Sequence, residues 1–363
     1  MTIKVGILTA PKIEYELREH TFVLKNVRIG IGFHWDRYED QEFAGKLEII
    51  ESQKPIANSQ QPLYTAINTI DLEDYLCSVI SSEMNANSPM ELLKAHAVIS
   101  RSWAMRAISR QHSAFRNHEG FDVCADDHCQ RYEGLRRMNE RAVEAVKATR
   151  GQVLVYGQRT KDNGQWTKEE ICDCRYYKCC GGRTEIWRTC WEDIDVPYIQ
   201  SVQCDWCKSP SPKVLRLVLN DYDQETKDFR DWSVSYTQDE LSEIIRTKSG
   251  IDFGEITDLI PLHRGASGRI DSLKIVGTKH TEIIGKELKI RLWLSRTCLY
   301  SSWFEVEKSI QNSVVSFQLS GHGWGHGAGL CQIGAAVMAS EGKTYEEILQ
   351  YYYRGAKLSP MAK

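Results

Sequence analysis

Glu83 is the residue of this chain whose type and setting best suit proton transfer to a substrate. The helical period places four apolar residues and this glutamate on one face: Leu72, Leu76, Val79, Ile80 and Glu83. Desolvation on such a face favours the protonated form of a carboxyl group, which suits a general acid. The competing interpretation is structural: Glu83 reaches water at the end of the helix or pairs with an arginine.

A glycine-rich segment near the end of the chain carries two further candidate groups, His322 and His326. Its five glycines between Gly321 and Gly329 allow the backbone to approach a ligand closely or to adopt positive φ angles. The histidines can bind a metal, transfer a proton or contact a sugar. No Gly-Lys-Ser/Thr follows, so the segment is not a phosphate loop. The alternative is a tight turn before a packed helix.

The twelve cysteines of the chain are mostly clustered, which indicates metal binding or disulfides. The first cluster places two nitrogen and two sulfur donors within twelve residues: His118, Cys124, His128 and Cys129. This set suits tetrahedral zinc and fills all four positions, so it predicts a structural ion rather than a catalytic one. A disulfide between Cys124 and Cys129 is the competing interpretation.

A second cysteine group combines Cys204 and Cys207 with Cys172 and Cys174. The spacing is compatible with a four-sulfur zinc site, a pair of disulfides or free thiols. A redox role for Cys204 and Cys207 is disfavoured, because the strand-to-helix setting usual for such a motif is not evident.

The elements that would position these groups follow from periodicity and capping. Short strands separated by polar turns are expected up to about residue 70. Capping signals and the helical period predict helices over residues 71–83, 88–110, 139–149 and 237–247, from about 332, and after Thr344, with a strand at 152–157.

The pattern predicts a strand-rich start followed by helices, with an inserted subdomain that mixes strands with a polar helix. The expected organisation is a strand-rich region over 1–70, a catalytic core over 71–207 plus 311–363, and the inserted subdomain over 208–310.

Composition excludes several classes of protein. A hydrophobic content of 42% is typical of a globular protein, and a formal net charge of −3 provides no general attraction for nucleic acid. No apolar run approaches the length of a membrane-spanning helix, and the first residues read as a strand rather than an export signal. A cytoplasmic location therefore stays open.

Several segments, taken together and in order, resemble the stage II sporulation protein D family, which includes the amidase-enhancer proteins of bacterial cell walls. The similar segments are residues 71–76, 82–84, 91–98, 128–132, 181–185, 325–335 and 351–353. The resemblance covers roughly residues 66–206 and 260–358. Departures from the family pattern occur at His96, Cys331 and the pair Cys179 and Cys180.

The resemblance implies an α+β fold, with mixed helices and antiparallel strands around a substrate groove and an inserted β-rich subdomain. It also implies cleavage of peptidoglycan between N-acetylmuramic acid and N-acetylglucosamine, with Glu83 as the catalytic glutamate. It also implies zinc binding by a His/Cys set like the one above. We expect five further residues to line the substrate groove: Lys94, Arg101, Tyr177, His326 and Gln332.

One glutamate is sufficient for a lytic transglycosylase. It protonates the leaving oxygen and then acts as the base while the sugar's own 6-hydroxyl closes a 1,6-anhydro ring, so proximity replaces a second carboxylate. A glycan hydrolase would need that second carboxylate, for which Asp122 and Glu185 are the candidates.

Two other classes of function remain as alternatives. One is a non-catalytic wall-binding protein that recruits an amidase, and the other is a cytoplasmic zinc protein. The resemblance implies an extracytoplasmic location in the periplasm or cell wall, with glycan strands and other cell-wall enzymes as partners and no nucleic acid.

Overall fold

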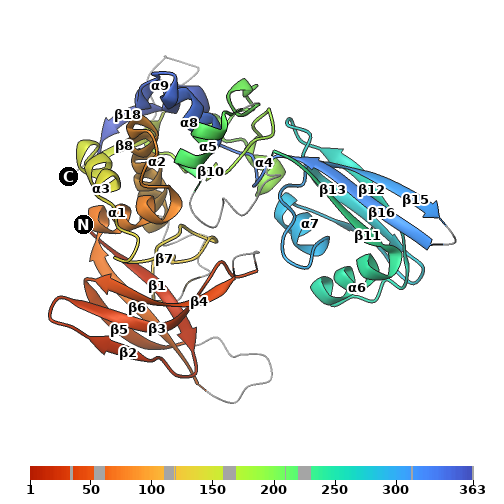
Figure 1. Cartoon of the computed structure of the whole chain (residues 1–363), viewed down its shortest axis with the longest axis horizontal. Helices are drawn as coiled ribbons and strands as arrows, with labels where there is room; N and C mark the ends of the chain where they lie inside the picture. The colour runs from red at the N-terminus through yellow and green to blue at the C-terminus, as the bar shows by residue number, and fades with distance from the viewer. Residues whose placement is uncertain are drawn as a thin grey trace, which may run out of the picture. The chain divides into compact units, whose positions relative to one another are not determined.

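The computed structural model describes residues 1–32, 36–52, 62–109, 118, 120–157, 169–208, 210–219, 230–311 and 314–361. The chain divides into two compact units (Figure 1). Unit 1 comprises Met1–Cys174, Leu217–Asp223 and Ala356–Lys363. Unit 2 comprises Arg175–Arg216 and Gln224–Gly355.

Unit 1 opens with two antiparallel sheets, as the strand-like runs predict. One sheet has the order β5-β6-β1-β7, in which the short β7 pairs parallel to β1, and the other has the order β2-β3-β4. The rings of Phe22 and Phe43 stack between β3 and β4 at 5.5 Å. The strands are β1 (Thr2–Ala10), β2 (Tyr15–Leu17), β3 (Thr21–Ile29), β4 (Arg37–Ala44), β5 (Lys46–Ser52), β6 (Leu63–Asp71) and β7 (Val123–Cys124).

Three helices of unit 1 pack on one another: α1 (Leu72–Glu83), α2 (Met90–Ser109) and α3 (Glu140–Ala148). Asp71 caps α1, because its side chain accepts the N–H of Glu73, and Asn139 caps α3 in the same way. Arg110, the predicted end of α2, lies outside the described residues. A third sheet, with the order β18-β8-β9, packs against α2 and consists of β8 (Gln152–Tyr156), β9 (Glu170–Ile171) and β18 (Lys357–Pro360).

Unit 2 contains two three-stranded antiparallel sheets and one short parallel pair. The sheets have the orders β11-β16-β15 and β12-β13-β14, and the pair joins β10 to β17. Buried apolar residues of both sheets share one core, which includes Trp232, Leu273 and Phe317. The strands are β10 (Tyr176–Tyr177), β11 (Asp231–Thr237), β12 (Ile256–Arg264), β13 (Ile270–Gly277), β14 (Thr281–Ile284), β15 (Phe304–Gln311), β16 (Val314–His322) and β17 (Leu330–Cys331).

Helices α6 and α9 of unit 2 begin where the capping signals predict, whereas α4, α7 and η1 have no side-chain cap and were not predicted. Thr237 with Glu240, and Thr344 with Glu347, form complete capping boxes. The helices are α4 (Trp187–Cys190), the 3₁₀ turn η1 (Asp205–Cys207), α6 (Gln238–Ser249), α7 (Glu287–Trp293), α8 (Gln332–Ser340) and α9 (Tyr345–Tyr352). Helix α5 (Pro212–Val218) contains the unit boundary at Arg216.

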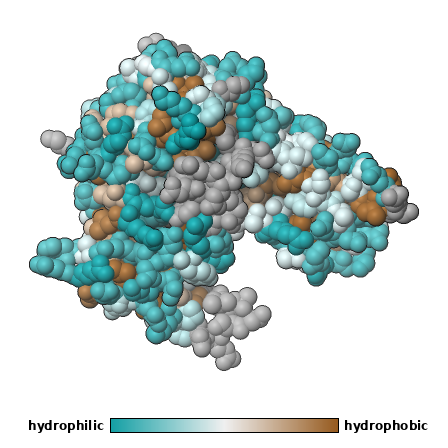
Figure 2. Space-filling model, in the orientation of Figure 1, coloured by the Kyte–Doolittle hydropathy of each residue, from teal (hydrophilic) through white to brown (hydrophobic). Residues whose placement is uncertain are grey.

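These elements confirm the predicted α+β class. The boundaries of the three predicted regions, 1–70, 71–207 plus 311–363, and 208–310, stay a prediction. Figure 2 shows a mainly hydrophilic surface with small separate apolar areas. Among the residues that the structure describes, no helix has the length and apolar content required to cross a membrane.

Candidate active site

Glu83 is the last residue of α1 and is buried, with 8% of its surface exposed. Its carboxylate accepts the backbone N–H of Arg131 at 3.3 Å. The neighbouring Ser82 hydroxyl accepts the N–H of Glu133 at 3.2 Å. The chain segment 129–133 therefore runs along the end of α1, and its backbone contacts the Glu83 carboxylate.

The predicted His/Cys set comes together at the start of this segment. The donor atoms of His118, Cys124, His128 and Cys129 all lie within 4.8 Å of one another. The His118 Nε2 atom is 3.3 Å from the Cys129 sulfur, and the His128 Nδ1 atom is 3.4 Å from it. Hydrogen bonds, above all from Cys129, hold the pKa of the Cys124 thiol well below its usual value. Two histidines and two cysteines at this spacing can hold one tetrahedral ion.

A cavity of about 760 Å³ adjoins this cluster. Strands β1 and β3 and the segment 121–133 line it, including Cys124, His128 and Arg131. Burial raises the pKa of Asp126, on the same wall, to about 6. Glu83 is not among the described residues that line this cavity.

Two of the five predicted groove residues belong to α2 of unit 1. Lys94 is partly exposed and forms an ion pair with Glu91 at 2.7 Å. Arg101 is fully buried, and its guanidinium donates to both carboxylate oxygens of Glu73 at 2.8 and 2.7 Å. It also donates to the carbonyl of Gln152. These contacts favour a structural role for Arg101 over the predicted one in a groove.

The other three groove residues belong to unit 2. The His326 ring lies 5.2 Å from the ring of Tyr177, and Gln332 is the buried first residue of α8. The Tyr177 hydroxyl is buried without a hydrogen-bond partner among the residues that the structure describes.

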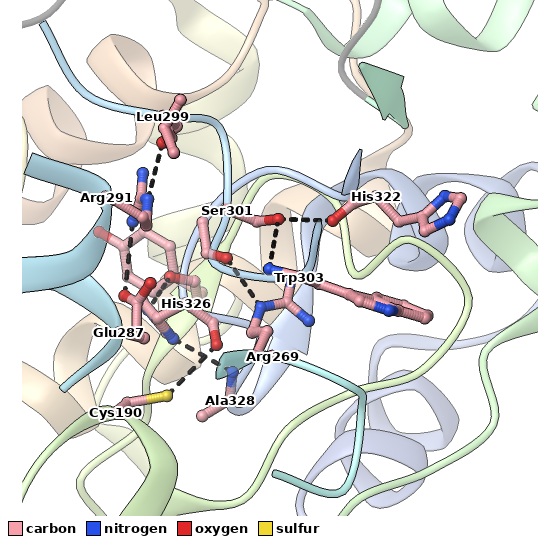
Figure 3. A network of polar contacts seen from close by, with 12 residues as sticks. Cys190, Arg269, Glu287, Arg291, Leu299, Ser301, Trp303, His322, His326 and Ala328 are labelled. Atoms are coloured by element: carbon pink, nitrogen blue, oxygen red, sulfur yellow. Dashed lines mark hydrogen bonds and ion pairs between the residues drawn. The ribbon is translucent and has the colours of Figure 1, made fainter. Parts of the chain in front are cut away.

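The backbone holds the His326 imidazole at both nitrogens. Nδ1 accepts the N–H of Ala328 at 3.1 Å (Figure 3), so Nε2 carries the proton and donates to the carbonyl of Tyr176 at 3.0 Å. Burial and three nearby arginines lower the pKa of His326 well below its usual value. His326 is therefore a neutral, fixed ring. His322 is exposed and pairs with Asp231 at 2.6 Å.

The two candidate second carboxylates are both engaged by backbone. Glu185 is fully buried and accepts hydrogen bonds from the N–H groups of Ile186, Ala266 and Ser267 and from the Ser267 hydroxyl. Asp122 accepts the N–H of Lys4 at 2.8 Å. The contacts of Glu185 are those of a residue that holds a loop in place.

The second cysteine group differs from the predicted one. Cys204 and Cys207 lie with Cys180 and Cys331, and the four sulfur atoms are all within 4.8 Å of one another. The spacing of Cys204 and Cys207 signals half of this set. Sequence reasoning missed the other half, because Cys180 and Cys331 are 151 positions apart and carry no local signal.

The fold and the site together define an α+β protein with a buried helix-end glutamate beside a His/Cys cluster. The model of a family described as stage II sporulation protein matches residues 60–156, which contain Glu83 and this cluster. A domain of unknown function matches residues 185–329.

Curated relatives match most of the chain. An uncharacterized protein of Brachyspira hyodysenteriae is 30% identical over 80% of this chain and 67% of its own length. The stage II sporulation protein D of Bacillus subtilis is 28% identical over 82% of this chain and 78% of its own length. The amidase enhancer of Bacillus subtilis is 27% identical over 78% of this chain and 40% of its own length. The chain belongs to the stage II sporulation protein D family.

Proposed function

We propose that this protein is a lytic transglycosylase of the bacterial cell wall that cleaves the glycan backbone of peptidoglycan between N-acetylmuramic acid and N-acetylglucosamine. The observation that carries the proposal is the position of Glu83: a buried carboxylate at the end of α1, held by the backbone N–H of Arg131. Family membership supports the assignment to the cell wall, through relatives named for sporulation and for amidase enhancement.

In the proposed reaction, Glu83 first donates a proton to the glycosidic oxygen that leaves. The bond to the anomeric carbon breaks as the 6-hydroxyl of the same muramic acid attacks that carbon. The Glu83 carboxylate then accepts the proton of this hydroxyl, and the product carries a 1,6-anhydro ring. The Arg131 N–H would keep the carboxylate oriented in both steps.

Lys94 on α2 is proposed as a substrate contact of unit 1, and Tyr177, His326 and Gln332 are proposed as substrate contacts of unit 2. His326 would act as a neutral ring that shapes the surface, since both of its nitrogens already bind backbone. Proton transfer is thereby assigned to Glu83 alone.

We propose a structural zinc ion for the cluster His118, Cys124, His128 and Cys129. The donor set fits: two imidazole nitrogens and two sulfurs lie within 4.8 Å of one another, and together they fill the four positions of tetrahedral zinc. The ion would fasten the start of the segment 129–133 and would leave no position for a substrate.

A hydrolase is the first alternative, and the contacts of Glu185 weigh against it. A carboxylate that accepts hydrogen bonds from three backbone N–H groups and a hydroxyl is poorly placed to activate water. The second alternative is a non-catalytic protein that recruits an amidase, for which the amidase enhancer among the relatives is the specific observation. The location proposed for either activity is extracytoplasmic, with glycan strands and other cell-wall enzymes as partners.

Mass analysis of the products from purified glycan strands tests the proposal. New 1,6-anhydro ends that accumulate with time are the expected result. New reducing ends would show instead that the protein is a glycan hydrolase. Binding to the strands without cleavage, together with stimulation of an added amidase, would show instead that the protein is a non-catalytic amidase enhancer.

A further inference from the structure

We infer that Cys180, Cys204, Cys207 and Cys331 bind a single zinc ion as a tetrathiolate site inside unit 2. All four residues are buried, and their sulfur atoms lie within 4.8 Å of one another. The sulfurs of Cys180 and Cys207 are 3.0 Å apart. This cluster has no part in the proposed cleavage reaction, and the inference does not depend on that reaction.

The spread of the four sulfurs matches one ion. Zinc binds thiolates at about 2.3 Å in a tetrahedron, which places the sulfurs roughly 3.8 Å from each other. An iron–sulfur cluster of several irons separates its thiolates further, because each binds a different metal atom. Because all four sulfurs lie within 4.8 Å of one another, their separations favour a site with a single metal ion over a cluster of several.

Backbone N–H groups point at two of the sulfurs. Gly182 donates to the sulfur of Cys180 at 3.4 Å. The sulfur of Cys331 accepts the N–H of Cys180 at 3.3 Å and that of Gly334 at 3.4 Å. Such donors stabilise a charged thiolate more than a neutral thiol, and outer-shell hydrogen bonds of this kind orient metal ligands. Cysteines buried only as small apolar side chains would not need them.

The backbone around the cluster is shaped for these bonds. Gly181 and Gly182 have φ angles of +79° and +126°, which turn the chain so that the N–H of Gly182 meets the preceding sulfur. Cys331 is the N-cap of α8, where the helix dipole also favours a negative sulfur. The buried Arg269 donates to the carbonyl of Cys180 at 3.4 Å and places a positive charge beside the anionic site.

The ion would fasten three separate segments of unit 2. Cys180 follows β10, Cys204 precedes the turn η1 and Cys207 ends it, and Cys331 ends β17, which pairs with β10. The hydroxyl of Tyr352 on α9 lies 3.3 Å from the sulfur of Cys204. The site would therefore fix the end of the glycine-rich segment that carries His326.

X-ray absorption at the zinc edge of the Cys129→Ser variant tests the inference. The protein is loaded with zinc under reducing conditions without chelator. Cys129→Ser disables the proposed His/Cys site, so the expected result is one zinc per chain with four sulfurs at about 2.3 Å.

Two further variants identify the ligands. Cys207→Ser, combined with Cys129→Ser, should abolish the remaining zinc. Cys204→His should keep one zinc there, with three sulfurs and one nitrogen, and this conservative variant guards against a loss due only to misfolding.

Cys298→Ala is the matched control, because Cys298 belongs to neither cluster and should leave the zinc content unchanged. Several results would overturn the inference: no zinc in Cys129→Ser, zinc bound there through nitrogen or oxygen atoms, iron in place of zinc, or disulfide bonds among the four cysteines in protein purified under the same conditions.

Discussion

The backbone N–H of Arg131 donates to the Glu83 carboxylate at 3.3 Å, and Cys129, two residues earlier in the chain, belongs to the His/Cys cluster. The proposed acid and the proposed metal site thus share one short segment. The segment is held further by the hydrogen bond from Tyr75 to Gln130 at 3.0 Å and by that from Tyr132 to Asn68 at 2.6 Å. The orientation of the carboxylate and the stability of unit 1 are therefore linked.

We predict that Glu83→Gln lowers glycan cleavage by about 10²–10⁴-fold or more, because the amide cannot deliver a proton. The amide oxygen can still accept the N–H of Arg131, so the melting temperature should change little. The measurement is the rate of release of anhydro ends. Glu133→Gln is the control, since Glu133 is a buried carboxylate of the same segment that pairs with Arg137. Near wild-type turnover in Glu83→Gln would show that another residue is the acid.

Removal of the proposed zinc from the His/Cys cluster should affect stability more than chemistry. In Cys129→Ser we expect the loss of one zinc per chain and a lower melting temperature of unit 1, because metal binding adds to the free energy of folding. Turnover per folded molecule should fall less than in Glu83→Gln. Elemental analysis and calorimetry measure both effects, with Cys77→Ala as a control outside the clusters. An unchanged zinc content and melting temperature would argue for a site without metal.

The ion pair between Arg101 and Glu73 should be a major contributor to the stability of unit 1. Arg101 is completely buried while Glu73 is 17% exposed, so Glu73→Gln leaves a buried charge uncompensated. We expect a loss of about 3–5 kcal/mol in the free energy of unfolding. The comparison is Glu91→Gln, which breaks a more exposed pair with Lys94 and should cost less than about 1 kcal/mol. Equal losses in denaturant titrations of the two variants would contradict the structural role of Arg101.

His326 should make unit 2 less stable in mild acid. Its pKa is lowered by burial in the folded protein, whereas the reference value for the group is 6.5. Below about pH 6.5 the unfolded chain therefore binds a proton that the folded chain does not, so the free energy of unfolding falls as the pH falls, by at most about 1.4 kcal/mol per pH unit. Above this pH the contribution is fully present.

His326→Gln should flatten this dependence between about pH 6.5 and 5. Urea titrations at several pH values provide the measurement, and the exposed His20 offers a control in His20→Gln. The same pH dependence in His326→Gln and in the wild type would assign the proton uptake to another group.

Local features of this protein were predictable from the sequence alone. Asp71 at the start of α1 and the capping boxes at Thr237 and Thr344 were identified correctly, because a cap depends on residues within a single turn. The gathering of His118, Cys124, His128 and Cys129 was also predictable, since all four lie within one short stretch of chain.

Contacts between distant segments were decided only by tertiary structure. The spacing of Cys204 and Cys207 predicts a pair of ligands but not their partners, which β10 and β17 bring together by pairing. Glu185 and Arg101 are plausible functional residues by type, and only their buried hydrogen bonds favour a structural role for them. The physical reason is the same in each case. Side-chain chemistry and local backbone preference depend on residues that are close in the sequence, whereas burial and hydrogen-bond partners depend on which distant segments pack together.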